Sequence, residues 1–271
     1  MTTRPLDGRS VVITGAGRGL GRAYALAAAA QGAQVVVNDI DADCAEAVCA
    51  EIVGRGGTAV VSGETVATPQ GASAIIAACC RNFGGIDALL NNAGLFHYTP
   101  AIAVDLAEAA QLVTVNLLGT LYCGVAAMRA MTPDRPGTII NVTSGAALGM
   151  DRMSVYAASK AGVTALTATW AIERPNGISV IGLSPIGTTR MTAMMPSSGH
   201  FPPEDIAPLA AFLLSSRARA LNGATVRLAK GQLSVLRPAS FTPSIAWDAT
   251  WDHARIAQEI ARLIDGAPGM D

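Results

Sequence analysis

The feature that most constrains the fold is a regular alternation between short runs of branched apolar residues and longer alanine-rich stretches. Runs such as Val11-Val12-Ile13 are typical of buried strands, and the stretches between them have the length and composition of helices. Because parallel strands need crossover helices, the alternation predicts an α/β fold with a doubly wound parallel sheet and helices on both faces. The expected strands lie at about 10–14, 34–38, 58–61, 86–90, 138–142, 178–183 and 224–228, and the expected helices at about 20–31, 43–54, 69–83, 106–131, 155–172 and 203–215.

The alternation also sets the expected domain organisation. It runs without a break through residues 1–231, so we expect a single catalytic domain over that range. Residues 232–271 form a C-terminal extension with a helical pattern at about 251–263. Its apolar positions would dock on the same domain or on a neighbouring subunit, and they are Ile256, Ile260 and Leu263.

Composition excludes several function classes. The formal net charge is −1, whereas a nucleic-acid binder needs a clustered basic surface. We find no run of 18 or more strongly apolar residues and no cleavable signal, so we expect no membrane partner and a cytoplasmic location. The five cysteines and three histidines show no metal-ligand spacing, so we expect no metal site.

A glycine-rich turn, Thr14–Gly21, lies between the first expected strand and helix. Such a turn lets the backbone approach a pyrophosphate at the start of a helix. Asp39 ends the second strand, 18 residues after Gly21, where a carboxylate can accept hydrogen bonds from a ribose and repel a 2′-phosphate. Arg18 favours NADP instead, but we predict NAD from Asp39. Glu64 could accept from the adenine amino group or be a solvated loop acid.

Tyr156 and Lys160 are four residues apart near the start of an expected helix, so both side chains share one face. A phenol is a poor base at neutral pH unless a nearby cation stabilises its phenolate, which Lys160 would do. Ser144 follows an expected strand at the sheet edge where such folds bind ligands, and its hydroxyl can hold a substrate oxygen. No acid and histidine accompany it in a recognisable triad, so we do not interpret it as a hydrolytic nucleophile.

Together these motifs resemble the short-chain dehydrogenase/reductase family, and the resemblance runs from about Leu6 to Gly231. Thr14–Gly21 resembles the family's TGxxxGxG turn, and Asn91–Gly94 resembles its NNAG segment. The family's catalytic asparagine, serine, tyrosine and lysine match Asn116, Ser144, Tyr156 and Lys160.

The resemblance implies a Rossmann-type fold, a homotetramer or homodimer, and hydride transfer between nicotinamide and a small-molecule substrate. Tyr156 would exchange the substrate proton, Lys160 would also bind the nicotinamide ribose, Ser144 would orient the substrate, and Asn116 would hold a water for a proton relay. The residues expected to contact the cofactor are Gly15, Arg18, Gly19, Leu20, Asp39, Glu64, Thr65, Asn92, Ala93, Gly94, Tyr156, Lys160, Pro185, Ile186 and Thr188. Segments 35–39 and 184–192 resemble most the hydroxyacyl-CoA dehydrogenase part of multifunctional β-oxidation enzymes.

The sequence departs from the family pattern in three places, one of which is the short segment between Thr192 and Pro203, where we expect an open or abbreviated lid. The gap between serine and tyrosine is about one residue shorter than usual, so strict counting would assign the catalytic serine's role to Thr143; we choose Ser144 because it fills the second position of the family's serine pair. The family's Pro-Gly after the sixth strand is Pro185-Ile186 here, which leaves the nicotinamide carboxamide contacts open around Ile186 and Thr188.

We predict a hydrophobic hydroxy or keto substrate, acyl or steroid-like, with adaptable methionines in its pocket. The apolar residues that would line this pocket, or else pack in the ordinary way, are Leu95, Phe96, Met150, Met153, Met191, Met194 and Met195. One alternative is an NADP-linked carbonyl reductase. An alternative of another class is an NAD-binding sensor or structural subunit without turnover.

Overall fold

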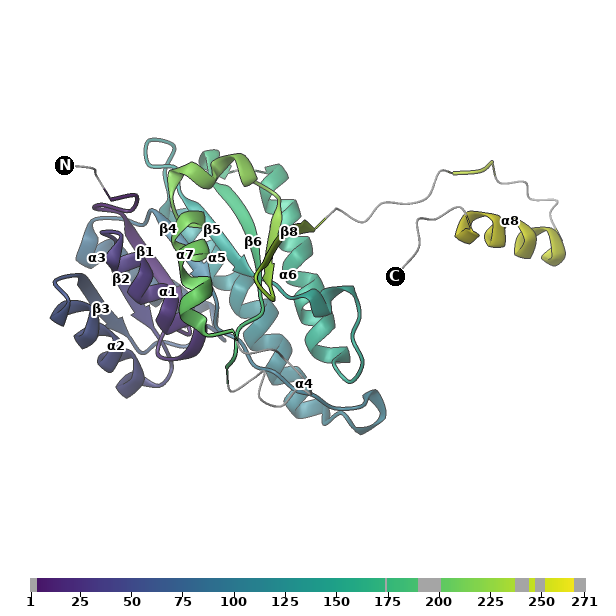
Figure 1. The fold of residues 1–271 in the computed structure, drawn as a ribbon, viewed down its shortest axis with the longest axis horizontal. Helices are drawn as coiled ribbons and strands as arrows, with labels where there is room; N and C mark the ends of the chain where they lie inside the picture. Colours follow the sequence, from purple (N-terminus) through teal and green to yellow (C-terminus); the bar gives the residue numbers. More distant parts are fainter. Residues whose placement is uncertain (1–3, 174, 190–200, 237–243, 247–251, 266–271) are drawn as a thin grey trace. The chain divides into compact units, whose positions relative to one another are not determined.

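The core of the structure, a computed structural model, is a sheet with the strand order β3-β2-β1-β4-β5-β6-β7-β8 (Figure 1). The structure describes residues 4–173, 175–189, 201–236, 244–246 and 252–265. Strands β1 to β7 pair in parallel, and the order reverses between β1 and β4, where open α/β sheets form a ligand crevice. The strands are β1 Ser10–Thr14, β2 Gln34–Asn38, β3 Thr58–Ser62, β4 Ala88–Asn91, β5 Thr138–Val142, β6 Ser179–Pro185, β7 Thr225–Ala229 and β8 Gln232–Leu236.

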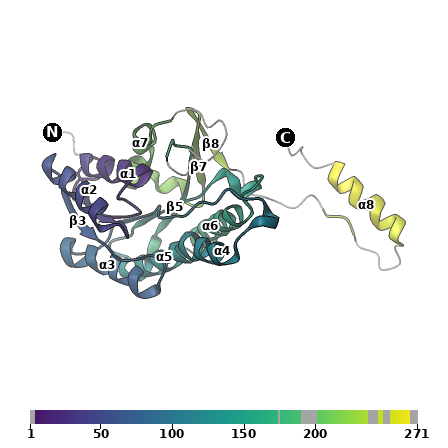
Figure 2. The same cartoon turned by 90° about the horizontal axis from the view of Figure 1, so that it is seen from below.

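Helices cover both faces of this sheet. In the view of Figure 2, α1, α2 and α7 lie on one side, and α3, α4, α5 and α6 lie on the other. A π-helical turn, η2 Thr114–Leu118, joins α4 and α5, and a short 3-10 turn, η3 Gly145–Leu148, follows β5. The helices are α1 Gly19–Ala30, α2 Ala42–Gly54, α3 Pro69–Phe83, α4 Leu106–Val113, α5 Gly119–Ala130, α6 Ser154–Glu173, α7 Pro203–Leu213 and α8 His253–Asp265.

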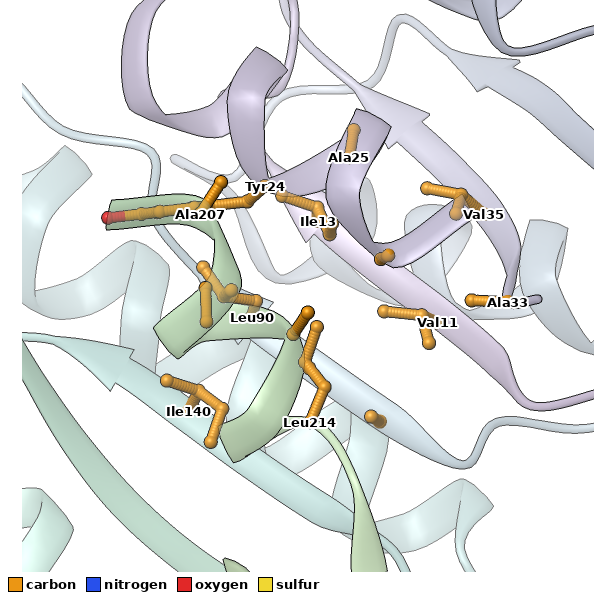
Figure 3. Packing of buried hydrophobic residues seen from close by; sticks show 14 of the residues in the cluster. Val11, Ile13, Tyr24, Ala25, Ala33, Val35, Leu90, Ile140, Ala207 and Leu214 are labelled. Atoms are coloured by element: carbon orange, nitrogen blue, oxygen red, sulfur yellow. The ribbon is translucent and has the colours of Figure 1, made fainter. Parts of the chain in front are cut away.

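The strands are apolar on both faces because each face packs on a helical layer. Val11 and Ile13 point into the cluster beneath α1 and α7, while Val12 between them points into the cluster beneath α3 and α5. Figure 3 shows the first cluster, in which Tyr24 of α1 and Leu214 after α7 pack over the strands. Burial on both faces explains the continuous runs of valine and isoleucine that predicted these strands.

Residues Leu106–Ala130 form a continuous helical stretch that is long and apolar enough to cross a membrane by length and composition. In the structure this stretch is a core helix, since Cys123 and Ala127 are fully buried against the sheet. Gly124 faces the ring of Trp170, and a Cβ built there would lie 2.5 Å from Trp170 Cη2. The apolar character is therefore explained by packing against α6 and the sheet.

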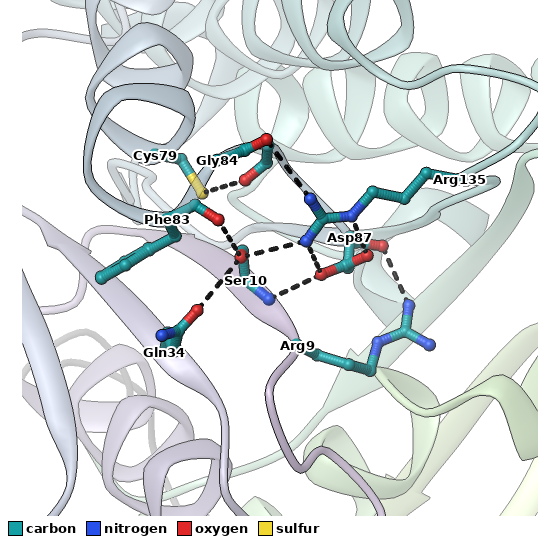
Figure 4. Close-up of polar contacts among 9 residues, drawn as sticks. Arg9, Ser10, Gln34, Cys79, Phe83, Gly84, Asp87 and Arg135 are labelled. Carbon is teal, nitrogen blue, oxygen red and sulfur yellow. Dashed lines mark hydrogen bonds and ion pairs between the residues drawn. The ribbon is translucent and has the colours of Figure 1, made fainter.

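A cluster of arginine and aspartate side chains links strands at the amino-terminal edge of the sheet, opposite the carboxyl edge where ligands bind (Figure 4). The Asp87 carboxylate accepts from Arg135 Nε at 2.7 Å and Nη2 at 2.6 Å, and from the Ser10 backbone N–H at 2.7 Å. Arg9 donates to the Asp87 carbonyl at 3.0 Å. Although burial opposes the shift, these donors hold the pKa of Asp87 below its usual range.

The α/β doubly wound fold is confirmed, with two differences in its elements. The helix expected at 106–131 contains the π-turn η2. The strand β8, which sequence analysis places in the extension, instead forms the edge of the sheet. Lys230 and Gly231 join it to β7 with φ values of 50° and 73°, as in a two-residue hairpin, and this pair is not among the strongest hairpin signals.

The chain divides into two units, Met1–Val235 and Leu236–Asp271. Within the second unit, α8 begins at His253, and Trp251, where we expected the helix to start, lies outside the described residues. Glu259 of α8 forms ion pairs with Arg255 at 2.6 Å and Arg262 at 3.3 Å. Docking of this helix on the domain or on another subunit stays a prediction.

Candidate active site

The glycine-rich turn between β1 and α1 has no room for side chains. Gly15 and Gly19 have φ values of +63° and +53°, a region that favours glycine. A Cβ built at Gly15 would lie 2.8 Å from Ala93 Cα, and one built at Gly21 would lie 2.0 Å from the Gly15 carbonyl oxygen. The turn therefore presents bare backbone at the carboxyl end of β1.

Helix α1 begins at this turn with its amide groups uncapped. Among the described residues, Arg18 at the N-cap makes no side-chain cap bond, and the first turn of α1 contains no acid. The first N–H groups of a helix lack intrahelical partners and carry partial positive charge. The turn and helix start thus fit the pyrophosphate of a dinucleotide cofactor, as a cradle of glycine backbone and free donors.

Asp39 lies beside this turn, directly after β2. Its Oδ2 accepts the Gly17 N–H at 2.9 Å, and its Oδ1 accepts the Asp41 N–H at 3.0 Å. Arg18 forms an ion pair with Asp41, which also caps α2 by accepting from the Cys44 N–H. The guanidinium that favoured NADP is therefore already paired with a carboxylate, and Asp39 keeps the position next to the glycines.

The segment after β4 is fastened to the same turn. Thr14 Oγ1 accepts the N–H groups of Asn92 and Ala93, each at 3.0 Å. In return, Asn92 Nδ2 donates to the carbonyls of Thr14 and Gly15, each at 3.0 Å. These hydrogen bonds join the turn after β1 to the segment after β4, so the predicted cofactor contacts Gly15, Asn92 and Ala93 are held together. The next residue, Gly94, lies beside the Asn116 side chain.

Glu64 and Thr65 follow β3 next to the end of β2. The Glu64 side chain is exposed, and its backbone carbonyl accepts from Asn38 Nδ2 at 2.8 Å. Thr65 Oγ1 accepts the Ala67 N–H at 3.1 Å. The structure places both residues at the same sheet edge as the turn, and among the described residues the Glu64 carboxylate forms no hydrogen bond or ion pair with the other predicted site residues.

Tyr156 and Lys160 lie on one face of α6, as their spacing predicts. Lys160 is 5% exposed and donates from Nζ to the Val142 carbonyl at 2.7 Å, and Nζ lies 5.8 Å from the centre of the Tyr156 ring. Burial lowers the pKa of Lys160 to about 8. Burial also raises the pKa of Tyr156, and a hydrogen bond with Ser144 acts in the opposite direction.

Ser144 is the residue that the structure brings to the tyrosine. It comes just after β5, and its Oγ accepts the Ala146 N–H at 3.1 Å at the start of η3. Thr143, the other candidate, is buried, and its Oγ1 has no hydrogen-bond partner among the described residues. The Ser144 hydroxyl lowers the pKa of Tyr156, and this favours the assignment to Ser144.

Asn116 lies on the π-turn η2 and is fully buried. Its Oδ1 accepts the Leu95 N–H at 2.7 Å, and its Nδ2 donates to the Leu95 carbonyl at 2.9 Å and to Ser159 Oγ at 3.2 Å. The extra residue of a π-turn re-aims the helix locally, and such turns are frequent at functional sites. Asn116 thereby links the segment after β4 to the helix that carries Tyr156, whereas its role in holding a water stays a prediction.

The segment after β6 closes over the start of α1. The Ile186 N–H donates to the Leu228 carbonyl at 2.9 Å, and a Cβ built at Gly187 would lie 3.0 Å from Leu20 Cδ2. Thr188 is held by Phe201, since its N–H donates to the Phe201 carbonyl at 2.6 Å and its Oγ1 accepts the Phe201 N–H at 2.8 Å. The predicted contacts Pro185, Ile186 and Thr188 therefore lie on a segment that meets the glycine turn at Leu20.

A cavity of about 70 Å³ lies beside Tyr156. Of the apolar residues expected around the substrate, Met153 lines it, and Phe96 packs edge-on against the Tyr156 ring with centroids 5.0 Å apart. Met150 is 46% exposed. Met191, Met194 and Met195 lie outside the described residues. The full lining is His97, Thr99, Ala103, Val104, Asp105, Glu108, Arg152, Met153, Ser154, Val155 and Tyr156.

Sequence reasoning missed two residues of this region. Asp41 pairs with Arg18, and its position as an acid directly before α2 is a helix-start signal that could have revealed its cap. Arg152 has a φ of 58°, its carbonyl accepts the Thr99 N–H at 2.7 Å, and its Cζ lies 5.9 Å from the centre of the Tyr98 ring. No sequence pattern indicates that backbone conformation for an arginine. Across the described part of the chain, no group of three or more histidine, cysteine or acidic residues could hold a metal.

Comparisons with known proteins agree with this geometry. A family model described as short chain dehydrogenase matches residues 9–201. A probable short-chain type dehydrogenase/reductase of Bradyrhizobium diazoefficiens is 35% identical over 284 residues, covering 97% of this chain and 98% of the relative. The peroxisomal hydratase-dehydrogenase-epimerase of Saccharomyces cerevisiae is 35% identical over 243 residues, covering 84% of this chain and 27% of that longer protein. The crystal structure of a short chain dehydrogenase from Mycobacterium avium superposes with a TM-score of 0.89 at 34% identity, covering 98% of this chain and 97% of the other.

Proposed function

The chain belongs to the short-chain dehydrogenase family, and on that premise we propose that it uses NAD to interconvert a secondary alcohol and a ketone. The observation that carries the proposal is the meeting of three groups at the carboxyl edge of the sheet. The Ser144 hydroxyl acts on Tyr156 by lowering the pKa of the phenol, and Lys160 lies on the same helical face as Tyr156, next to the end of β5. Phenol, hydroxyl and ammonium are the groups that proton exchange with a carbinol oxygen requires.

In alcohol oxidation, Tyr156 Oη accepts the hydroxyl proton of the substrate, and in ketone reduction it returns a proton to the carbonyl oxygen. Ser144 Oγ holds the substrate oxygen at the tyrosine. Bound NAD⁺ supplies the hydride acceptor and a positively charged ring. The proton transfer by Tyr156 contributes roughly 10²–10⁴-fold to the rate, which is the usual range for a positioned acid or base.

The charge state of Lys160 supports this role for Tyr156. With a pKa of about 8, Lys160 is predominantly protonated at neutral pH even though it is buried. An ammonium near a phenol favours the phenolate, whereas burial raises the pKa of Tyr156. The hydrogen bond with Ser144 acts in the same direction as the ammonium.

Asp39 supports NAD as the cofactor rather than NADP. The Gly17 N–H holds the Asp39 carboxylate beside the glycine turn, where an anion would accept from ribose hydroxyls and repel a 2′-phosphate. Arg18, the one residue that favours an NADP-linked carbonyl reductase, is paired with Asp41. A switch to NADP would require this ion pair to break.

The cavity beside Tyr156 supports a substrate with an apolar body and a polar group. Met153 and Val155 contribute apolar lining, and Phe96 packs against the catalytic ring. Thr99 and Ser154 offer hydroxyls, and the other polar lining residues are His97, Asp105, Glu108 and Arg152. We therefore propose a mainly hydrophobic hydroxyacyl or steroid-like substrate. The similarity to a hydratase-dehydrogenase-epimerase of yeast is in line with the acyl alternative.

We also propose that the protein acts in the cytoplasm as a homotetramer or homodimer. These proposals rest on the family's usual behaviour, and light scattering coupled to size-exclusion chromatography tests the oligomeric state. A mass equal to one chain of 27.6 kDa would contradict the oligomer.

The decisive experiment follows NADH absorbance across a panel of acyl, steroid-like and simple aliphatic alcohols and ketones, with NAD(H) and NADP(H) in parallel. We expect turnover with NAD(H), and Tyr156→Phe should reduce kcat about 10²–10⁴-fold while leaving NAD binding intact. Silence over the whole panel despite tight NAD binding would instead favour a sensor or structural subunit.

A further inference from the structure

Arg227 of β7 reaches across the neighbouring strand towards the catalytic serine. It lies opposite Ser184 in the register of β6 and β7, and its Nη1 donates to Ser184 Oγ at 3.0 Å. Its guanidinium packs on Gly145, where a built Cβ would lie 2.2 Å from Nη1 and 2.8 Å from Cζ. A single side chain therefore touches the turn after β5 and the end of β6.

These two contacts adjoin both halves of the site. Gly145 directly follows Ser144, whose hydroxyl lowers the pKa of Tyr156. Ser184 directly precedes Pro185 and the segment that meets the glycine turn. Any shift of the Arg227 guanidinium therefore acts on the serine that orients the substrate and on the segment expected to border the nicotinamide.

No ion pair explains why an arginine occupies this place. Among the described residues, no carboxylate lies within 4.0 Å of the half-buried Arg227 guanidinium, and its bond to Ser184 uses one of five donors. A partly buried charge without a counter-charge is unfavourable for stability alone. A packing role would be filled as well by methionine.

We infer that Arg227 is a positioning residue for the reaction, because it fixes the turn Ser144-Gly145 against the end of β6 and so aims the Ser144 hydroxyl at Tyr156. The inference rests on the proposed function of Ser144 and Tyr156. The contact also requires glycine at position 145, since any side chain there would displace the Arg227 guanidinium. The loss of Arg227 lets the turn move, and the bond from Ser144 to the phenol is weakened.

The first test compares Arg227→Met, which keeps the length and packing of the stem, with Arg227→Lys. We expect Arg227→Met to reduce kcat about ten-fold with the KM for NAD within two-fold of wild type, since small misplacements of catalytic groups are costly. Arg227→Lys should recover part of this loss. The matched control is Arg219→Met, which removes an arginine that donates to the Pro136 carbonyl away from the site and should leave kcat unchanged.

A second readout follows the acid/base group itself in the NAD-saturated protein. The Ser144 hydroxyl lowers the pKa of Tyr156. The other titratable or charged groups near the ring are Lys160 and, in the lining of the adjoining cavity, His97, Asp105, Glu108 and Arg152, and the variant replaces none of them. We expect Arg227→Met to move the midpoint of the kcat–pH profile for alcohol oxidation upward. An ultraviolet difference titration against Tyr156→Phe reports the same upward shift without any turnover.

A double-mutant cycle tests the contact directly. Gly145→Ala should reduce kcat in the wild type but have a smaller effect in the Arg227→Met background, where the clash is absent. The inference is overturned if Arg227→Met lowers Tm but keeps the wild-type kcat and the wild-type titration of Tyr156, or if the two substitutions act independently. If no substrate is turned over by the wild type, the proposed function fails, and the titration still decides on Arg227.

Discussion

Replacement of the Asp39 carboxylate by an amide should change the choice of cofactor without disturbing the turn. Asp39→Asn keeps an oxygen that can accept the Gly17 N–H, whereas Asp39→Ala would leave that group without its partner. Loss of a charge-assisted hydrogen bond to the ribose weakens the binding of NAD by about 2 kcal/mol, which is a factor of about 30 in the dissociation constant. Two like charges about 4 Å apart, such as the Asp39 carboxylate and a 2′-phosphate, repel by about 4 kcal/mol near a protein surface. Screening at half-exposed Asp39 reduces this repulsion to about 1.4 kcal/mol. Removal of the charge should therefore raise the affinity for NADP about ten-fold.

Dissociation constants for NAD⁺ and NADP⁺ from titration calorimetry measure both effects, and their ratio should narrow by about 300-fold. Asp43→Asn is the matched control, because it removes an exposed carboxylate from the first turn of α2 and should change either constant less than two-fold. An unchanged ratio in Asp39→Asn would mean that this carboxylate does not face the ribose, and the argument for NAD would fail.

Three further substitutions test the energetics of the site and the fold. Between its folded pKa of about 8 and the ordinary lysine pKa of 10.5, buried Lys160 has lost a proton that the unfolded chain retains, so its contribution to stability rises with pH. Urea unfolding should show that the stability of the wild type relative to Lys160→Met increases by about 2 kcal/mol between about pH 7 and pH 9.5, and a flat difference would contradict the burial argument. Asp87→Asn should cost about 2 kcal/mol in urea unfolding at neutral pH, because the Arg135 fork loses its charged acceptor. The lowered pKa of Asp87 makes its contribution present at neutral pH and lost as pH falls through the folded pKa, so a penalty that persists in acid would argue against it. Gly21→Ala should weaken NAD binding by more than ten-fold in calorimetry, since its Cβ would collide with the turn, whereas Gly54→Ala, with open space around it, should bind NAD normally.

Much of the fold follows from the sequence because burial on both faces forces long apolar runs into each central strand. Val11 and Val35 lie in strands whose bounds agree with prediction. The edge of the sheet lacks this signal, since Gln232 and Leu233 of β8 are exposed and the strand depends on pairing with β7. The π-turn at Asn116 has no signature in apolar spacing, so a continuous helix was the natural prediction.

The site divides along the same line. Tyr156, Lys160 and Ser144 could be placed because their spacing on a helix and a strand end fixes which face and edge they share. Arg227 could not, because its contact with Gly145 depends on side-chain reach across β6 between segments 82 positions apart in the chain. Such contacts depend on tertiary packing, so the local spacing of residues in the sequence does not predict them.

The hydrogen bonds between the segments of Thr14 and Asn92 determine how rigid the cofactor-binding half of the site is when the cofactor binds. Four mutual hydrogen bonds hold these two segments in one arrangement, and none of the four involves a cofactor atom. Little conformational entropy of the protein is then lost when the cofactor binds. This part of the site should therefore be preorganised for the adenine and pyrophosphate groups, with an association rate set by diffusion and orientation. Any slow step in the catalytic cycle should therefore originate in other parts of the molecule.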